Sequence, residues 1–253
     1  MTSLNKMTPT VFIFVGHSGS GKSTLARCIL GIWPQMAGEV LLDERPIQGW
    51  NRDELGAYIG YLPQDIELFE GTIAENIARL GEVDAQKVIA AAKDAGLHEM
   101  ILRFPKGYDT SMGEAGNLLS GGQRQRIGLA RAIYGQPALV VLDEPNASLD
   151  AEGEEALRQA IQEMRTRGST IIVIAQRFGI LNMADKVLVL DNGKMDAFGD
   201  RRDVSEKIRS GRTSLPVRQQ LIATRKVVKQ LGHEGLSTPT VTPGDVVSET
   251  AVP

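Results

Sequence analysis

The sequence predicts an α/β fold in which a mostly parallel sheet is interrupted by a helical insertion. Short, continuous apolar runs such as 11–15 and 138–142 are typical of strands that are buried on both faces. Helix-forming segments alternate with these runs, as they do in doubly wound folds. One stretch, 71–103, is rich in Ala, Glu and Lys without β-branched runs, so the block at 65–129 is expected to be mostly helical.

The expected elements follow from these patterns along the chain. Strands are expected at 11–15, 40–42, 59–62, 138–142, 170–175 and 187–190, and helices at 23–31, 121–134 and 152–167. The segment 110–119 is expected to be a glycine-containing loop, and 191–194 a tight turn. Apolar residues near helical spacing predict a further helix at 216–231, and the Ser-, Thr- and Pro-rich sequence beyond Gly232 predicts disorder.

This order of elements predicts three parts. The core is discontinuous and comprises 1–64 and 130–213. The helical subdomain is 65–129, and the C-terminal helix and tail are 214–253.

Composition excludes several classes of protein. Lys and Arg number 28 against 31 Asp and Glu, so the net charge of −3 does not favour nucleic acid as a partner. Cys28 is the only cysteine, which excludes an intramolecular disulfide and a cysteine-based zinc site. No apolar run is long enough to span a membrane, and Met1–Thr10 lacks the features of a secretory signal. A soluble chain in a reducing compartment is expected.

A phosphate-binding loop is predicted between the first strand and the first helix. Gly16–Ser23 reads GHSGSGKS and matches the pattern G-x-x-x-x-G-K-[ST] without a mismatch. Its glycines let backbone N–H groups converge on phosphate oxygens, Lys22 adds a positive charge, and the Ser23 hydroxyl can ligate Mg²⁺. The expected nucleotide-binding residues of this segment are Gly16, Ser18, Gly19, Ser20, Gly21, Lys22, Ser23 and Thr24.

Two carboxylates end a later strand. Because 138–142 is apolar, Asp143 is expected at the carboxyl edge of the sheet, beside the phosphates and a Mg²⁺ ion. Glu144 follows directly and can act as the general base for the attacking water. Together with the phosphate loop, this pair predicts a nucleoside triphosphatase with a P-loop NTPase core.

A second anion site is predicted at the start of the helix that follows the insertion. Leu119–Gln123 reads LSGGQ and offers a Ser hydroxyl and glycine amides at a helix N-terminus. With this pentapeptide, the sequence resembles the nucleotide-binding domain of an ABC transporter over roughly residues 11–213. The resemblance implies a head-to-tail homodimer. In it, ATP bound to the phosphate loop of one chain is also contacted by Ser120, Gly121, Gly122 and Gln123 of the other chain.

Other segments extend the resemblance. Gln64 matches the glutamine that senses Mg²⁺ and the γ-phosphate, so Ser23, Gln64 and Asp143 are the implied metal ligands. The segments 68–77 and 110–116 are similar to those of exporters, and the motifs together look most like type I protein-secretion ATPases of the protease-exporting kind. This implies a membrane-spanning exporter domain, a membrane-fusion protein and an outer-membrane channel as partners, at the cytoplasmic face of the inner membrane.

The sequence departs from that family in two places. Gln176 stands where the family has a histidine that contacts the γ-phosphate, and an amide cannot carry the charge of an imidazolium. Only Met1–Thr10 precedes the first strand, where the family has a β-subdomain with an aromatic residue that stacks on adenine. Phe12 and Phe14 are expected to be packing residues, and the chain is expected to be a truncated form, a separate subunit or a remnant of a longer gene.

Three hypotheses follow. The first is an ATPase that drives export, with Glu144, Lys22 and Gln176 as the catalytic residues. The second is a degenerate or regulatory subunit that binds ATP with little hydrolysis, which Gln176 favours and Glu144 opposes. The third is an ABC ATPase acting on DNA or ribosomes, which the acidic balance and the lack of a coiled-coil insertion or paired cassettes do not support.

Overall fold

The computed structural model describes residues 9–115, 119–176 and 178–215. The chain divides into two compact units, Met1–Val217 and Arg218–Pro253, and every described residue belongs to the first. The helix expected at 216–231 and the disorder expected beyond Gly232 lie outside the described residues. The division of the first unit into a discontinuous core and a helical subdomain stays a prediction.

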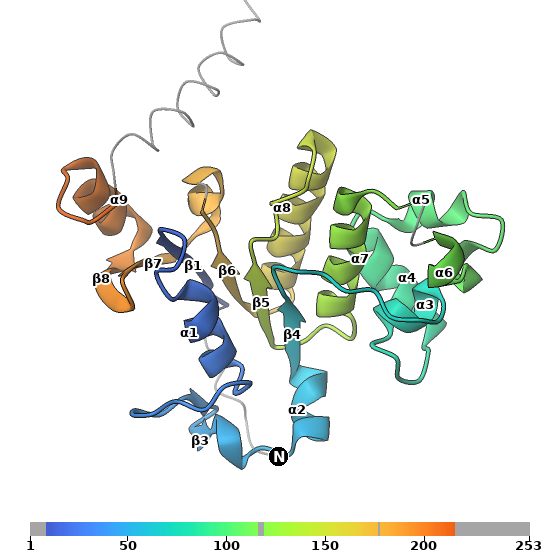
Figure 1. The fold of residues 1–253 in the computed structure, drawn as a ribbon, viewed down its shortest axis with the longest axis horizontal. Helices are drawn as coiled ribbons and strands as arrows, with labels where there is room; N and C mark the ends of the chain where they lie inside the picture. Colours follow the sequence, from blue (N-terminus) through green and yellow to red (C-terminus); the bar gives the residue numbers. More distant parts are fainter. Residues whose placement is uncertain (1–8, 116–118, 177, 216–253) are drawn as a thin grey trace, which may run out of the picture. The chain divides into compact units, whose positions relative to one another are not determined.

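In the described part of the chain, six strands form one sheet in the order β4-β5-β6-β1-β7-β8 (Figure 1). Their bounds are β1 (Val11–Gly16), β4 (Ile59–Leu62), β5 (Leu139–Asp143), β6 (Thr170–Ile174), β7 (Lys186–Asp191) and β8 (Lys194–Asp200). Neighbouring strands run parallel except for the β7–β8 hairpin. The mostly parallel α/β sheet predicted from the sequence is therefore confirmed. Two further strands, β2 (Leu41–Leu42) and β3 (Arg45–Pro46), form a separate antiparallel pair.

Helices connect the strands, and five of them (α3 to α7) lie in the segment between β4 and β5. Their bounds are α1 (Lys22–Ile29), α2 (Arg52–Tyr58), α3 (Ile73–Ile77), α4 (Ala85–Asp94), α5 (His98–Leu102), α6 (Met112–Ala115), α7 (Gly121–Ile133), α8 (Ala151–Thr166) and α9 (Arg201–Arg209). Short 3₁₀ turns lie at Ile47–Gly49, Gly107–Asp109 and Phe178–Met183. The starts of α3 and α7 are both fixed by capping boxes, in which a Thr or Ser and a Glu or Gln three residues later satisfy each other's backbone N–H groups.

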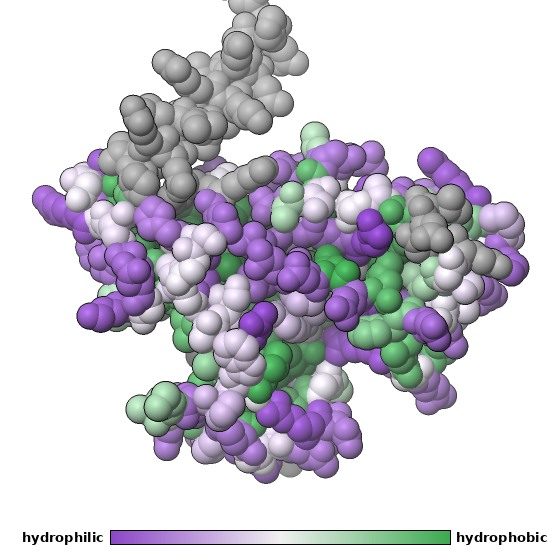
Figure 2. Space-filling model, in the orientation of Figure 1, coloured by the Kyte–Doolittle hydropathy of each residue, from purple (hydrophilic) through white to green (hydrophobic). Residues whose placement is uncertain are grey.

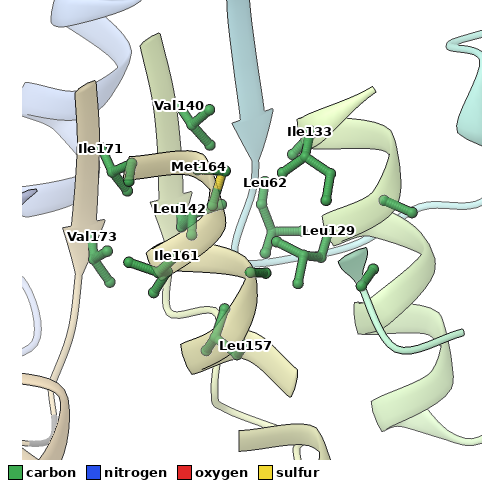
Figure 3. Packing of buried hydrophobic residues seen from close by; sticks show 14 of the residues in the cluster. Leu62, Leu129, Ile133, Val140, Leu142, Leu157, Ile161, Met164, Ile171 and Val173 are labelled. Atoms are coloured by element: carbon green, nitrogen blue, oxygen red, sulfur yellow. The ribbon is translucent and has the colours of Figure 1, made fainter. Parts of the chain in front are cut away.

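The sheet separates two cores, because successive side chains of a strand point to opposite faces. On one face, Val140 and Leu142 of β5 pack with residues of α7 and α8, among them Leu129 and Ile161 (Figure 3). On the other face, residues such as Val141 pack with α1. Phe14 is buried in this second core and Phe12 packs against it, so both are packing residues as predicted.

The structure corrects one expectation and adds elements that the sequence patterns did not predict. The segment expected to be a loop at 110–119 contains α6, and its start is held against the start of α3 by the bonds Met112 N to Gly71 O (2.7 Å) and Ile73 N to Thr110 O (3.0 Å). The elements without a predicted counterpart are α2, β3, β8 and α9. In α9 only Val204 and Ile208 are buried, so its charged sequence carries a weak apolar pattern.

Hydrophilic residues cover most of the face that Figure 2 shows, and apolar residues reach it in scattered places. Large apolar side chains with high exposure include Met36, Leu41 and Met195. Within the described ranges, no helix combines the length and the apolar character that crossing a membrane requires.

Candidate nucleotide-binding site

The predicted phosphate loop joins the end of β1 to the start of α1. Gly19 and Gly21 have φ angles of 77° and 95°, a region that glycine adopts without the strain of a side chain. A Cβ on Gly16 would lie 2.3 Å from Leu190 O, so the loop can pass close to β7 only with glycine at this position. Ser18, Gly19 and Thr24 are exposed and Ser23 is half-buried, which leaves the loop and the first turn of α1 open to a ligand.

Lys22 is folded back into its own loop. Its ammonium donates hydrogen bonds to Gly16 O (2.9 Å), His17 O (2.7 Å) and Ser20 Oγ (3.3 Å), and the residue is 5% exposed. Burial lowers the pKa of Lys22, and the nearby carboxylates of Glu144 and Asp143 oppose that shift. A buried ammonium whose acceptors are mainly neutral carbonyls is well placed to bind an anion.

Asp143 ends β5 as a fully buried carboxylate. Neither of its oxygens has a hydrogen-bond partner of normal geometry among the described residues. Burial raises the pKa of Asp143, and the neighbouring Ser23 hydroxyl opposes that shift. An unpaired buried carboxylate is costly unless a cation accompanies it, so the site fits a bound Mg²⁺.

Most of the other ligands of a bound Mg²⁺ would be phosphate oxygens and water instead of carboxylates. The described residues contain no group of three or more His, Cys, Asp or Glu side chains that could hold a metal ion. Mg²⁺ typically takes one or two carboxylates together with substrate phosphates and water. One carboxylate beside a phosphate loop agrees with that pattern.

Glu144 follows Asp143 and is held at three points. Its N–H donates to Ile174 O (3.0 Å) of β6, its carbonyl accepts from Gln125 Nε2 (2.9 Å), and its carboxylate accepts from Gln176 Nε2. The residue has a φ of 50°, a left-handed conformation that is uncommon for a residue with a side chain. Such strain persists where the surrounding contacts over-determine the backbone.

Gln64 lies at the same edge of the sheet. It is exposed and comes two residues after Leu62, which pairs with Leu142 directly before Asp143. Gln176 follows β6 in the same way. The carboxyl ends of the neighbouring strands β4, β5, β6 and β1 therefore bring together Gln64, Asp143 with Glu144, Gln176 and the phosphate loop.

The LSGGQ residues belong to a different surface of the chain. Ser120 Oγ accepts from Gln123 N (3.2 Å) and Gln123 Oε1 accepts from Ser120 N (2.9 Å), which leaves Gly121 exposed at the start of α7. A Cβ on Gly122 would lie 2.9 Å from Ser148 O, so glycine lets α7 pack against the loop after β5. Helix α7 packs mainly on β4, α3 and α4, whereas α1 packs on β1 and β5.

Gln125 belongs to the site, although no sequence pattern predicted it there. This residue of α7 is 4% exposed, and its side chain contacts both Glu144 and Ser148. Its spacing could have indicated this place, because Gln125 lies four residues before the apolar Leu129 and therefore on the same face of the predicted helix.

Comparison with known proteins decides the family. The family model described as ABC transporter matches residues 3–147, which is more than half of the chain. The chain belongs to the ABC transporter family. The type I secretion system ATP-binding protein PrsD of Rhizobium meliloti (strain 1021) is 54% identical over 191 residues, which are 75% of this chain and 33% of that protein.

Other ABC proteins are similar over the same part of the chain. The ATP-dependent lipid A-core flippase of Saccharophagus degradans is 40% identical over 76% of this chain and 33% of that protein. The mycobactin import ATP-binding/permease protein IrtA of Mycolicibacterium thermoresistibile is 44% identical over 75% of this chain and 21% of that protein.

Solved structures give the same picture. A bacterial Atm1-family ABC exporter with ATP bound superposes with a TM-score of 0.72 at 35% identity, covering 78% of this chain and 35% of that one. The P-loop NTPase fold of an ABC ATPase is thereby confirmed. The chain spans about a third or less of the length of these relatives.

Proposed function

We propose that this chain binds ATP with Mg²⁺ and hydrolyses it as the ATP-binding part of an ABC exporter. One observation carries the proposal: the buried, unpaired Asp143 carboxylate lies at the sheet edge that also holds the phosphate loop and Glu144. A buried carboxylate whose oxygens accept no hydrogen bond of normal geometry from the described residues is difficult to explain as a structural feature, and a nucleotide-bound cation would coordinate these oxygens.

Each residue has a defined role in this reaction. The loop amides of 16–23 bind the phosphates, and Lys22 exchanges its carbonyl acceptors for phosphate oxygens. Ser23, Gln64 and Asp143 would hold Mg²⁺, which supplies positive charge against that of the phosphates. Glu144 accepts a proton from the water that attacks the γ-phosphorus, as the bond to the ADP oxygen breaks.

The position of α7 favours action as a head-to-tail homodimer. The described hydrogen bonds of Ser120 are local to the start of α7. Exposed Gly121 and the N–H groups at this helix start are available to a phosphate from outside the chain. We infer that Ser120, Gly121, Gly122 and Gln123 close over ATP bound to the phosphate loop of a second copy.

Protein export by a type I secretion system is the transport function we propose. The 54% identity to PrsD exceeds the 40% to a lipid flippase and the 44% to an importer. The partners would be a membrane-spanning exporter domain, with a membrane-fusion protein and an outer-membrane channel. The chain would work at the cytoplasmic face of the inner membrane.

A second candidate is an ABC subunit that binds ATP with little hydrolysis. The hydrogen bond from Gln176 Nε2 to Glu144 Oε1 favours this candidate, because it engages a carboxylate oxygen that would otherwise be free to accept a proton from water. The complete phosphate loop, Asp143 and Glu144 favour hydrolysis.

Turnover separates the two candidates. ATP hydrolysis by the full chain is measured over a range of protein concentrations, with equilibrium binding of ATP measured in parallel. We expect a rate that rises more steeply than linearly with concentration, because two chains form each site. Binding without turnover would support the second candidate, and absence of binding would refute both.

A further inference from the structure

Gln125 joins the helix that begins at Ser120 to the turn that begins at Glu144. Its side-chain N–H group donates to Glu144 O at 2.9 Å, and its side-chain oxygen accepts from Ser148 N at 3.0 Å. The Glu144 carbonyl accepts and the Ser148 N–H donates, so the side chain between them must offer both a donor and an acceptor, as an amide does. Because the residue is 4% exposed, water cannot easily replace either bond.

Among the described residues, few hydrogen bonds from other segments hold the turn that Gln125 spans. Within it, Ala147 N donates to Glu144 O at 3.1 Å, and the conformation of Glu144 is the uncommon left-handed one. The contacts that fix it from outside are Glu144 N to β6, Gln176 to the carboxylate, and Gln125 of α7. Gln125 is therefore the hydrogen-bonding residue by which α7 determines where the backbone of Glu144 lies.

The connection from Ser120 to Gln125 along the first turns of α7 is short and stiff. Gln125 is five residues after Ser120, about 7–8 Å along a helix that rises 1.5 Å per residue. At the first turn of α7, Gly122 also lies against Ser148 O, which would be 2.9 Å from a Cβ on that glycine. A displacement of the start of α7 must then shift Ser148 and Glu144 with it, because packed elements move as units.

We propose that Gln125 is a positioning residue that couples ATP held at Ser120 to the placement of Glu144 in the same chain. This rests on the proposed function and extends it. ATP of the partner's phosphate loop pulls on the start of α7, and Gln125 carries that movement to the general base of this chain's own site. The two ATP sites of a dimer are thereby linked through the interior of each chain.

Two substitutions separate the bonds of Gln125. Gln125→Met keeps the size of the side chain and removes both bonds. Gln125→Glu keeps an acceptor for Ser148 N but cannot donate to Glu144 O while it is ionised. Ser169→Ala is the matched control, because it removes a buried hydrogen bond (Ser169 Oγ to Pro137 O, 2.8 Å) next to the amino end of β6, away from the nucleotide.

We expect both Gln125 variants to lower kcat by about 10- to 100-fold while the KM and the Kd for ATP change less than about twofold. Gln125→Glu should recover activity as the pH is lowered relative to wild type, because burial favours the protonated carboxyl, which can donate to Glu144 O again. Ser169→Ala should show unchanged kcat and no such pH response. A residue that only stabilises the fold would lower kcat and binding together and would show no acid recovery.

Hydrogen exchange gives a readout that does not depend on turnover. In wild type, ATP should slow amide exchange in the peptide 144–149, and Gln125→Met should abolish this response. An unchanged response, or unchanged kcat in both variants, would overturn the role of Gln125. If wild type binds ATP without turnover, the proposed hydrolysis fails, and the exchange experiment still decides the coupling by itself.

Discussion

The side-chain amide of Gln176 donates a hydrogen bond to Oε1 of Glu144, so the second residue after β6 directly contacts the expected general base. A neutral amide can orient this carboxylate, but it can neither take up a proton nor place a charge beside a phosphate. The contact thus fixes the direction of the base while supplying no electrostatic stabilisation for transferred phosphate.

Replacing Gln176 by histidine is expected to raise kcat for ATP. An imidazole at this position can donate to a phosphate oxygen and, when protonated, add a positive charge where negative charge is held. We expect an increase of about 10-fold or more in steady-state ATPase assays at pH 7. Gln176→Ala should lower kcat below wild type, because Glu144 loses its only side-chain hydrogen bond among those described. Equal kcat in all three chains would show that position 176 does not limit hydrolysis.

Replacing Glu144 by glutamine is expected to stop hydrolysis and to trap ATP-bound dimers. The isosteric amide keeps the shape of the site but cannot accept the proton of the attacking water. Light scattering after gel filtration should show a dimer with ATP and Mg²⁺ and a monomer with neither. The exposed Glu154→Gln on α8 is the control and should hydrolyse ATP like wild type. The dimer model fails if ATP leaves the proportion of monomer of Glu144→Gln unchanged.

The candidate site could be predicted from sequence mainly where one local pattern specifies both backbone and chemistry. The phosphate loop is such a case, because glycines at 19 and 21 specify positive φ angles as well as room for phosphate. Asp143 was expected at the carboxyl edge of the sheet and lies there at the end of β5, because an apolar strand of a parallel sheet ends at that edge. The inferred roles of these residues in catalysis remain predictions.

Contacts between distant segments could not be predicted in the same way. The bonds of Gln125 to Glu144 and of Gln176 to Glu144 join residues 19 and 32 positions apart, and no local pattern encodes them. Helix α9 was missed because its charged sequence buries only two apolar side chains, and α6 because its four residues are too few to give a periodic signal.

Replacing Asp143 by asparagine is expected to stabilise the nucleotide-free chain while abolishing hydrolysis. The pKa of Asp143 is raised in the folded state because burial disfavours the charged form. Between the ordinary pKa of an aspartate and this raised value, the folded state binds more protons than the unfolded state. The free energy of unfolding of wild type therefore falls as pH rises through that window, and the loss persists at pH 7.

Thermal unfolding without Mg²⁺ or nucleotide tests this prediction. At pH 7 the variant Asp143→Asn should unfold at a higher Tm, by about 2–4 °C for each kcal/mol gained, and the difference should shrink towards pH 4. Asp191→Asn, at the half-exposed end of β7, is the control and should show a smaller effect. A lower Tm for Asp143→Asn at pH 7 would mean that the carboxylate has a stabilising partner in the free protein.

Replacing Arg79 is expected to destabilise the fold through the segment between β4 and β5. The guanidinium donates to five backbone carbonyls: Arg131 O (3.0 Å), Gly56 O (2.6 Å), Ile59 O (3.0 Å), Ala132 O (3.0 Å) and Tyr134 O (3.2 Å). It thereby joins the end of α3 to the end of α7 and to the start of β4. Burial lowers the pKa of Arg79, yet arginine stays protonated in proteins, so all five bonds are charge-assisted.

Urea denaturation of Arg79→Lys and Arg79→Met measures the contribution of this contact. Lysine has three N–H donors on a single atom and cannot reach carbonyls arranged around a planar guanidinium, so we expect a loss of about 1–3 kcal/mol. Methionine removes all donors and leaves the partly buried carbonyls without this charged partner, so we expect about 3–5 kcal/mol. Arg158→Met, an exposed arginine of α8, should stay within about 0.5 kcal/mol of wild type. Equal stability of Arg79→Met and wild type would show that water satisfies these carbonyls and that Arg79 is not needed to hold the end of α7.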